Sequence, residues 1–248
     1  NTIEDSPKTT GLSYSVSRNN NVGLGISIIS DKIFIENQTM LTIDFSYKLT
    51  LSNDGILFLG IKGGGNSYNA DPTPLLGFSE IPDPAQKSLS RFNPNMGVGF
   101  LFKIVGFWIS GSMPRLFNVK RDEDIEIQSR DRIHVYLGGG GEFKISEDFA
   151  IKPNLMYRKG QGLPNSFDFG GWISYLNKFD IGISSRSGSV FSFLASVGLG
   201  ENISIGYAYD TYRNDTLSGL NLKGHALAIS FNIGVAPEKN VEQESPEE

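Results

Sequence analysis

The stretch Leu41–Leu51, LTIDFSYKLTL, alternates strictly between apolar and polar residues. All six odd positions are apolar, and all five even positions are polar. An α-helix would spread the six apolar residues around its circumference, whereas a β-strand places them on one face. This stretch therefore predicts a long strand with one apolar and one polar face.

The same period of two recurs along the chain, and it predicts thirteen strands and no amphipathic helix. Most of these segments are about 9–13 residues long, which exceeds the mean globular strand of about 5–6 and matches a tilted membrane strand of about 9–11. The expected spans are 10–18, 22–30, 39–51, 56–66, 94–103, 105–114, 133–145, 150–159, 166–176, 179–186, 189–199, 202–212 and 224–235.

Composition excludes several classes of function. The 22 Lys and Arg residues against 27 Asp and Glu residues give a net charge of −5, which argues against a nucleic-acid partner. The chain has no Cys and two His, so disulfides, thiol catalysis and Cys-ligated metals are excluded, and a multi-His metal site nearly so. No cofactor is expected. No run of 18 apolar residues occurs.

Two all-β architectures fit the alternation. A soluble sandwich points its apolar face inward, whereas an outer-membrane barrel points that face to lipid and lines a polar lumen with the other. Strand length, aromatic residues near strand ends and alternating short and long connections favour the barrel. We therefore expect a transmembrane antiparallel up-and-down β-barrel over residues 1–235, followed by a disordered acidic tail over 236–248.

The connections predict the orientation of the barrel. Tight turns are expected at 19–21, 52–55, 104, 146–149, 177–178 and 200–201, and mostly longer loops at 31–38, 67–93, 115–132, 160–165, 187–188 and 213–223. Short turns of bacterial barrels are periplasmic, so the C-terminus is expected in the periplasm and the long loops outside. Because such barrels have an even strand number, we expect a fourteenth strand upstream of Asn1.

Seven segments of this chain, in this order and spacing, resemble the PorP/SprF family of type IX secretion system outer-membrane proteins from the Bacteroidota. The resemblance covers roughly residues 13–235. The segments are VGLGISIISDKI at 22–33, LFLGIKG at 57–63, PNMGVGF at 94–100, ISGSMPRL at 109–116, KPNLMYRK at 152–159 with Leu163-Pro164, ISIGYAYD at 203–210 and GHALAISF at 224–231.

The resemblance implies a non-enzymatic role in the secretion or surface anchoring of partner proteins, including adhesins of gliding motility. The implied partners are the C-terminal domain of a type IX substrate, a periplasmic peptidoglycan-associated lipoprotein or components of the secretion ring, and outer-membrane lipid. The composition leaves a small-solute channel open as the alternative, because Gly and Ser are frequent on the polar face.

The polar face carries five basic and four acidic residues. A set of one sign favours an ion-selective pore, whereas a balanced set favours salt bridges that plug or stiffen the lumen. The expected lumen charges are Asp44, Lys48, Lys62, Glu142, Lys152, Arg158, Asp168, Asp180 and Arg186.

Neither histidine predicts catalysis. His134 is expected on the lumen face without a carboxylate pair or Ser at a recognisable spacing, so a hydrogen-bonding role is favoured. His225 is expected on the apolar face near the interface. The run Gly138–Gly141 lacks the Lys-Ser/Thr of a phosphate loop, and instead predicts a bulky neighbour or a close backbone approach.

Loop 67–93 is the expected docking site for a partner. It combines prolines with large apolar residues, which lose less entropy on binding than a flexible polar loop. The mixed charges of loop 115–132 are either solvated or form a polar rim. The residues expected to contact a partner are Leu75, Leu76, Phe78, Ile81, Arg115, Lys120 and Arg121; the alternative is that loop 67–93 closes the barrel mouth.

Overall fold

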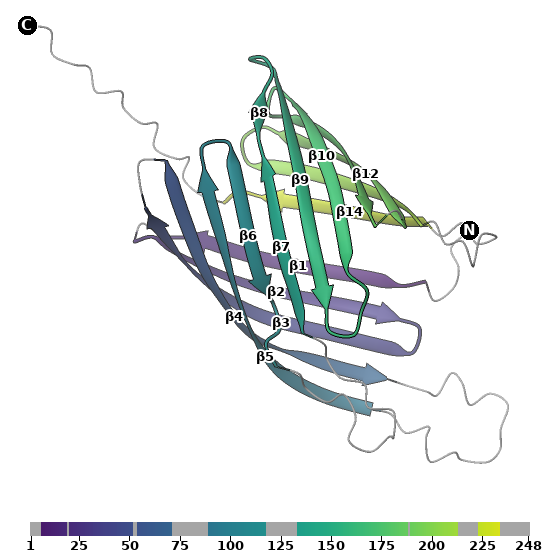
Figure 1. The fold of residues 1–248 in the computed structure, drawn as a ribbon. Helices are drawn as coiled ribbons and strands as arrows, with labels where there is room; N and C mark the ends of the chain where they lie inside the picture. Colours follow the sequence, from purple (N-terminus) through teal and green to yellow (C-terminus); the bar gives the residue numbers. More distant parts are fainter. Residues whose placement is uncertain are drawn as a thin grey trace, which may run out of the picture. The chain divides into compact units, whose positions relative to one another are not determined.

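The fold of the chain is an antiparallel β-sheet, seen here in a computed structural model (Figure 1). The structure describes residues 6–18, 20–51, 54–70, 89–117, 133–187, 189–212 and 223–233. Its strands are β1 (Lys8–Ser17), β2 (Val22–Ile33), β3 (Glu36–Thr50), β4 (Gly55–Ala70), β5 (Leu89–Ile104), β6 (Phe107–Met113), β7 (His134–Gly141), β8 (Phe143–Lys144), β9 (Phe149–Gly160), β10 (Ser166–Tyr175), β11 (Phe179–Arg186), β12 (Val190–Leu199), β13 (Ile203–Tyr212) and β14 (Lys223–Phe231).

Strands that follow one another in sequence pair with each other, as in an up-and-down sheet. The order runs from β1 to β14 through thirteen strands, while the two-residue β8 lies off this path and pairs with β9. The thirteen predicted strands are thus confirmed, and β8 is the end of the expected strand 133–145. The strands β1 and β14 are the two ends of this order. The sheet is therefore not closed into a ring within the described residues.

Two compact units divide the chain. The first comprises residues 1–143 and 153–169, and therefore β1–β7 with most of β9 and the start of β10. The second comprises 144–152 and 170–248, and therefore β11–β14 with the start of β9 and the end of β10.

Two expected loops are shorter than predicted. The segment 31–38 is almost entirely strand, and β2 joins β3 through Phe34 and Ile35 alone, with Phe34 at φ 53°. This turn has no Gly or Asn to signal it. Likewise β4 continues to Ala70 and β5 begins at Leu89, because strand pairing continues past Pro94. A proline inside a paired strand is unusual, which is why the sequence predicted a strand start there.

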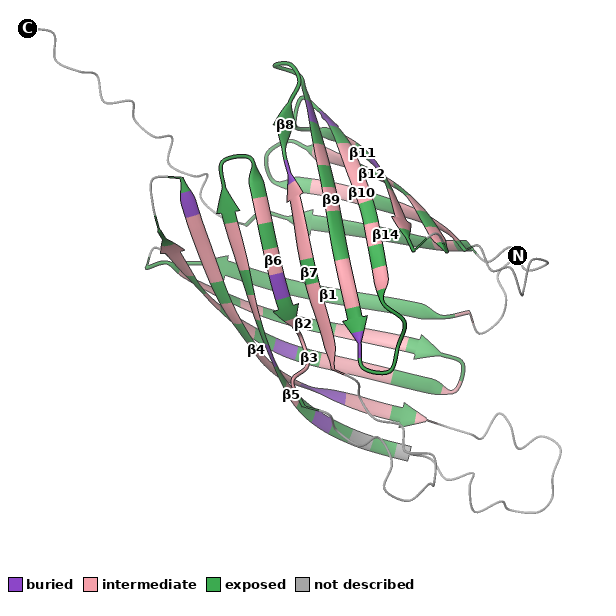
Figure 2. Ribbon diagram, in the orientation of Figure 1, coloured by how far each residue is buried: buried purple, intermediate pink, exposed green. Residues whose placement is uncertain are grey.

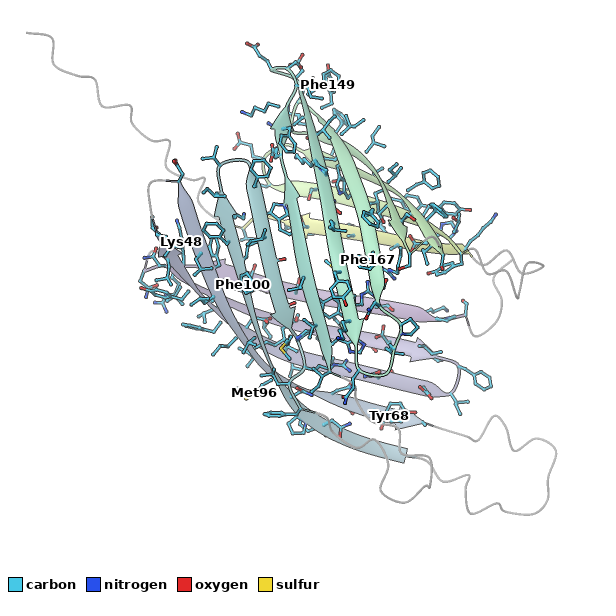
Figure 3. All side chains as sticks on the ribbon, viewed as in Figure 1. Lys48, Tyr68, Met96, Phe100, Phe149 and Phe167 are labelled. Atoms are coloured by element: carbon cyan, nitrogen blue, oxygen red, sulfur yellow. The ribbon has the colours of Figure 1, made fainter. Side chains whose placement is uncertain are left out.

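Between Leu41 and Tyr47 of β3, exposed apolar residues alternate with buried or half-buried polar residues, as the period of two predicts. Figure 2 colours the strands by this exposure. Within the part of the chain that the structure describes, fifty large hydrophobic side chains are exposed, among them Ile43 at 61%, Ile61 at 54% and Ile181 at 69% of their surface. Among the described residues the one buried hydrophobic side chain is that of Ala150. Figure 3 labels two of these exposed side chains, Met96 and Phe100 of β5.

The exposed apolar face decides between the two architectures. In water, a large apolar side chain that stays half exposed lacks on the order of 1 kcal/mol of the stabilisation that full burial would give. For fifty such side chains the missing stabilisation amounts to tens of kcal/mol. Domain stability is only about 5–15 kcal/mol, and a soluble sandwich cannot leave that much unburied. The apolar face therefore belongs against an apolar medium, as on a membrane sheet.

Candidate functional site

The polar face of the sheet carries ion pairs between strands, two of them between neighbouring strands and one, from β9 to β11, across β10. Six of the nine charged residues expected there form three pairs: Asp44 with Lys62, Arg158 with Asp168, and Lys152 with Asp180. The balance of charge predicted such pairing. A further pair of hydroxyls, Ser27 and Thr42, lies 2.7 Å apart on the same face.

Strand register creates the pair Asp44–Lys62. These residues are direct cross-strand neighbours in β3 and β4, and Lys62 Nζ lies 3.4 Å from Asp44 Oδ1. Both side chains keep more than a third of their surface exposed, at 36% and 40%. Cross-strand pairs of this exposure contribute well under about 1 kcal/mol each, so this pair neutralises charge more than it stabilises the sheet.

The pair Arg158–Asp168 is tighter and better shielded. Arg158 Nη2 donates to Asp168 Oδ2 at 2.9 Å, and the two side chains are 27% and 19% exposed. The Ser166 hydroxyl donates to the other carboxylate oxygen at 3.3 Å, and the Arg158 guanidinium lies over the Tyr136 ring at 5.5 Å. This network links β7, β9 and β10 within the first unit.

In the second unit, Lys152 of β9 contacts one residue on β10 and one on β11. Its Nζ donates to the Ser174 hydroxyl at 3.4 Å and lies 3.7 Å from Asp180 Oδ1. The distance to Asp180 is too long for a hydrogen bond, and that oxygen is buried without one. Ser174 is the most deeply buried polar residue of the described chain, at 1% exposure.

The remaining three expected charges are placed differently. Lys48 lines an open groove of about 650 Å³ over β1–β4, together with Asp44. Glu142 falls in the break between β7 and β8, is exposed, and its backbone N–H donates to the Gly106 carbonyl at 2.8 Å. Arg186 is the last residue of β11 and is exposed.

The first unit has a partly open cavity of about 320 Å³ on this face. Lys62, Arg115 and His134 bring the ionisable groups to it. The residues lining the cavity are Met40, Thr42, Lys62, Gly64, Gly65, Asn66, Asn93, Asn95, Pro114, Arg115, His134 and Tyr136. The three asparagines Asn66, Asn93 and Asn95 were not predicted as site residues, although the alternation along β4 and β5 places them on the polar face.

Asn95 holds the chain segment that carries Arg115. Its Oδ1 accepts hydrogen bonds from the backbone N–H of Leu116 at 3.0 Å and of Phe117 at 3.2 Å, and its Nδ2 donates to the Phe117 carbonyl at 3.0 Å. Gly97 is required beside it, because a Cβ there would lie 2.6 Å from the Pro114 carbonyl oxygen. The arginine was predicted at the edge of a docking loop; the structure places it at the cavity.

The two histidines lie on opposite faces. His134 begins β7, lines the cavity and stacks on Tyr136 with ring centroids 6.2 Å apart. His225 lies on the exposed apolar face of β14, where its Nδ1 is 2.7 Å from the Tyr207 hydroxyl and its ring is 5.2 Å from that of Tyr209. Each histidine lies on the face that the sequence predicts for it.

The glycine run of β7 makes room for a tryptophan, as predicted. A Cβ at Gly140 would lie 2.8 Å from the Trp108 ring and 2.7 Å from the Pro153 carbonyl oxygen, and one at Gly138 would lie 3.2 Å from the same ring. In the second unit Gly182 admits Trp172 in the same way, with 2.7 Å to its ring. Both tryptophans of the chain therefore lie against glycines.

Most of the expected docking residues lie outside the described residues. These are Leu75, Leu76, Phe78, Ile81, Lys120 and Arg121, and the tail 236–248 lies outside them as well. Within the described ranges, no helix has the length and apolar character to cross a membrane. The same ranges contain no group of three or more His, Asp or Glu placed to hold a metal ion.

An antiparallel sheet with an exposed apolar face and an ion-paired polar face defines a β-sheet membrane protein. The family model described as "Type IX secretion system membrane protein PorP/SprF" matches residues 1–231. The chain belongs to this family, which confirms the resemblance found in the sequence. The family is a membrane component of a secretion system and not a known enzyme family. No curated protein matches the chain.

Proposed function

We propose that this protein is a non-enzymatic outer-membrane barrel of the type IX secretion system that supports secretion or surface anchoring of a partner protein. The observation that carries the proposal is the exposed apolar face of the sheet, combined with the family match over residues 1–231. In this proposal residues 1–235 form one barrel, the polar face lines its lumen, the long loops are extracellular and the acidic tail 236–248 is periplasmic.

The ion pairs support a stiff scaffold. Pairs Asp44–Lys62, Arg158–Asp168 and Lys152–Asp180 cancel most of the charge on the polar face and link strands, the third pair across β10. A rigid barrel wall is suited to a protein that acts by binding its partners. The proposed partners are the C-terminal domain of a secreted substrate, such as an adhesin of gliding motility, and a periplasmic lipoprotein or component of the secretion ring.

The test is co-purification from native membranes combined with deletion. A strain lacking this protein should lose surface display of at least one secreted protein, and the protein should co-purify with components of the secretion machinery. Unchanged surface proteins together with purification as an isolated barrel would contradict the proposal.

The proposed docking site is the segment between β4 and β5, within the predicted loop 67–93. Leu75, Leu76, Phe78 and Ile81 contact the partner, and Arg115, Lys120 and Arg121 lie at the rim. Replacing residues 74–82 by a Gly/Ser linker should abolish partner retention and leave outer-membrane permeability unchanged. Retained partner with new permeability to small solutes would instead identify the loop as a plug.

A small-solute channel is the second candidate. The groove of about 650 Å³ over β1–β4 favours it, because its polar wall is built of small residues such as Ser13, Ser15 and Gly25. Planar-bilayer recordings distinguish the two functions. A scaffold with a filled lumen is nearly silent, whereas a channel conducts steadily.

A further inference from the structure

A hydrogen-bonded polar pair lies on the apolar face of β13 and β14. The Tyr207 hydroxyl and His225 Nδ1 are 2.7 Å apart, and both side chains are exposed on this face. Polar side chains are costly in the hydrocarbon layer of a bilayer, whereas Tyr and His are stable where their polar tips reach headgroups and water. The pair therefore places this part of the two strands near the membrane surface.

A row of rings supports the same placement. Phe193, Tyr209 and His225 are direct cross-strand neighbours in β12, β13 and β14. The ring centroids of Phe193 and Tyr209 are 6.5 Å apart, and those of Tyr209 and His225 are 5.2 Å apart. Aromatic girdles of membrane barrels lie at the interface between lipid and water, so this row sets His225 at the level of the lipid headgroups.

The polarity of β14 changes at this level. Lys223 and His225 occupy the face at the start of the strand. The residues that follow on the same face are apolar and exposed: Leu227 at 69%, Ile229 at 54% and Phe231 at 64%. Alternate residues of a strand lie about 7 Å apart, so the long side chain of Lys223 can bind the same headgroup as the His225 ring.

These two residues supply donors for a ligand. When the Tyr207 hydroxyl donates to Nδ1, the neutral imidazole of His225 carries its hydrogen on Nε2, and in the imidazolium both nitrogens carry one. Nε2–H is a donor in either form. Lys223 contributes an ammonium group, and within the described ranges no carboxylate lies within ion-pair distance of it. A cation and an N–H donor at headgroup level favour a phosphate.

We propose that Lys223 and His225 bind the phosphate of a membrane lipid, with Tyr207 as a positioning residue that orients the imidazole. The start of β14 follows the predicted loop 213–223, so in the proposed orientation the lipid belongs to the outer leaflet. The site lies within the second unit. It rests on the placement of the apolar face in lipid and not on the role in secretion. A failure of phosphate binding would leave the oxygen accessibility of the apolar face unchanged, so the two claims are tested separately.

The test uses the two histidines of the chain as reporters. Full-length protein without a histidine tag is labelled with nitrogen-15 histidine, held in dodecyl maltoside at constant pH and titrated with dioleoyl phosphatidic acid. The Nε2 shift of His225 should change saturably in NMR spectra, whereas His134, which lines the cavity of the first unit, should not respond. His225→Gln assigns the signals.

Two control ligands separate the parts of the lipid. Dioleoylglycerol has the acyl chains without the phosphate, and inorganic phosphate has the anion without the chains. At the same concentration and pH, both should leave the His225 shift at its value in the lipid-free protein, because the site combines an apolar face with a phosphate donor set.

Three variants keep the His225 reporter. Lys223→Gln should weaken phosphatidic acid about fivefold, the effect of one basic residue at a membrane surface. Tyr207→Phe should change the Nδ1 shift in the lipid-free protein and weaken the lipid about threefold, because the imidazole loses the hydrogen bond that orients it. Lys178→Gln is the matched control, since Lys178 is exposed in the same unit but lies in the turn between β10 and β11. Each variant is first checked for heat-modifiable gel migration.

Three results would overturn the proposal. The first is that phosphatidic acid leaves the His225 shift unchanged. The second is that dioleoylglycerol or inorganic phosphate produces the same change as phosphatidic acid. The third is that the folded Lys223→Gln and Tyr207→Phe variants bind phosphatidic acid as the wild type and Lys178→Gln do.

Discussion

Arg158 and Asp168 face each other across β9 and β10 with 2.9 Å between guanidinium nitrogen and carboxylate oxygen. The Arg158 Nε is buried and has no acceptor, so Asp168 neutralises a guanidinium that is already incompletely bonded. Removing Asp168 therefore costs more than removing one partner of an exposed pair, because it leaves this guanidinium without its counter-ion.

The first prediction compares two ion pairs. Asp168→Asn should lower the free energy of unfolding by about 1–3 kcal/mol, because it leaves a largely buried guanidinium without its counter-ion. Asp44→Asn, the matched control at 36–40% exposure, should cost at most about 1 kcal/mol. Urea unfolding in detergent, followed by tryptophan fluorescence, measures both. Equal losses would show that burial does not distinguish the two pairs.

The second prediction concerns the packing of Trp108 against Gly140 of β7. Gly140→Ala should destabilise the protein by about 1–3 kcal/mol, because the new methyl group meets both the Trp108 ring and the Pro153 carbonyl. Gly139→Ala is the control, since its Cβ would lie 3.6 Å from the nearest atom, an ordinary contact. The temperature at which the compact gel band disappears reports the difference.

A double variant separates the two clashes at Gly140. Adding Trp108→Ala to Gly140→Ala removes the ring but not the Pro153 carbonyl, so the double variant should lose less than the sum of the single losses. Additive losses would mean that the ring does not lie against Gly140.

The third prediction tests the role of Asn95. Asn95→Ala removes the side-chain bonds to the backbone of Leu116 and Phe117 and should increase trypsin cleavage after Arg115. Mass spectrometry of the fragments identifies this cleavage among others. Asn37→Ala, at an exposed position of β3, should leave it unchanged. Unchanged cleavage in both variants would show that Asn95 does not hold this segment.

The strands were predictable because one physical rule sets them. Each strand places every second residue against an apolar medium. Apolar residues such as Ile43 and Ile181 therefore indicate a strand from the local sequence alone, before any neighbouring strand is known. The turn at Phe34 and Ile35 was not predictable, because an aromatic residue at positive φ is held by the pairing of β2 with β3 and not by turn chemistry.

The candidate site was predictable only in part. The charge balance indicated ion pairing, and the register of β3 and β4 supplied the partner of Lys62. The cavity could not be predicted, because it brings together Asn66, Arg115 and His134 from three separate parts of the chain. The alternation along a strand predicts on which face a residue lies. It does not predict which residues of other strands lie beside it.

The central claim is that the apolar face contacts lipid, and labels on the two faces of β11 test it most directly. The chain has no cysteine, so Ile181→Cys and Ser184→Cys each provide a single site for a spin label in bilayers. A label at 181 should be relaxed by oxygen, which concentrates in lipid, and one at 184 by a water-soluble nickel complex. Preferential relaxation of the label at 181 by the nickel complex would contradict the account.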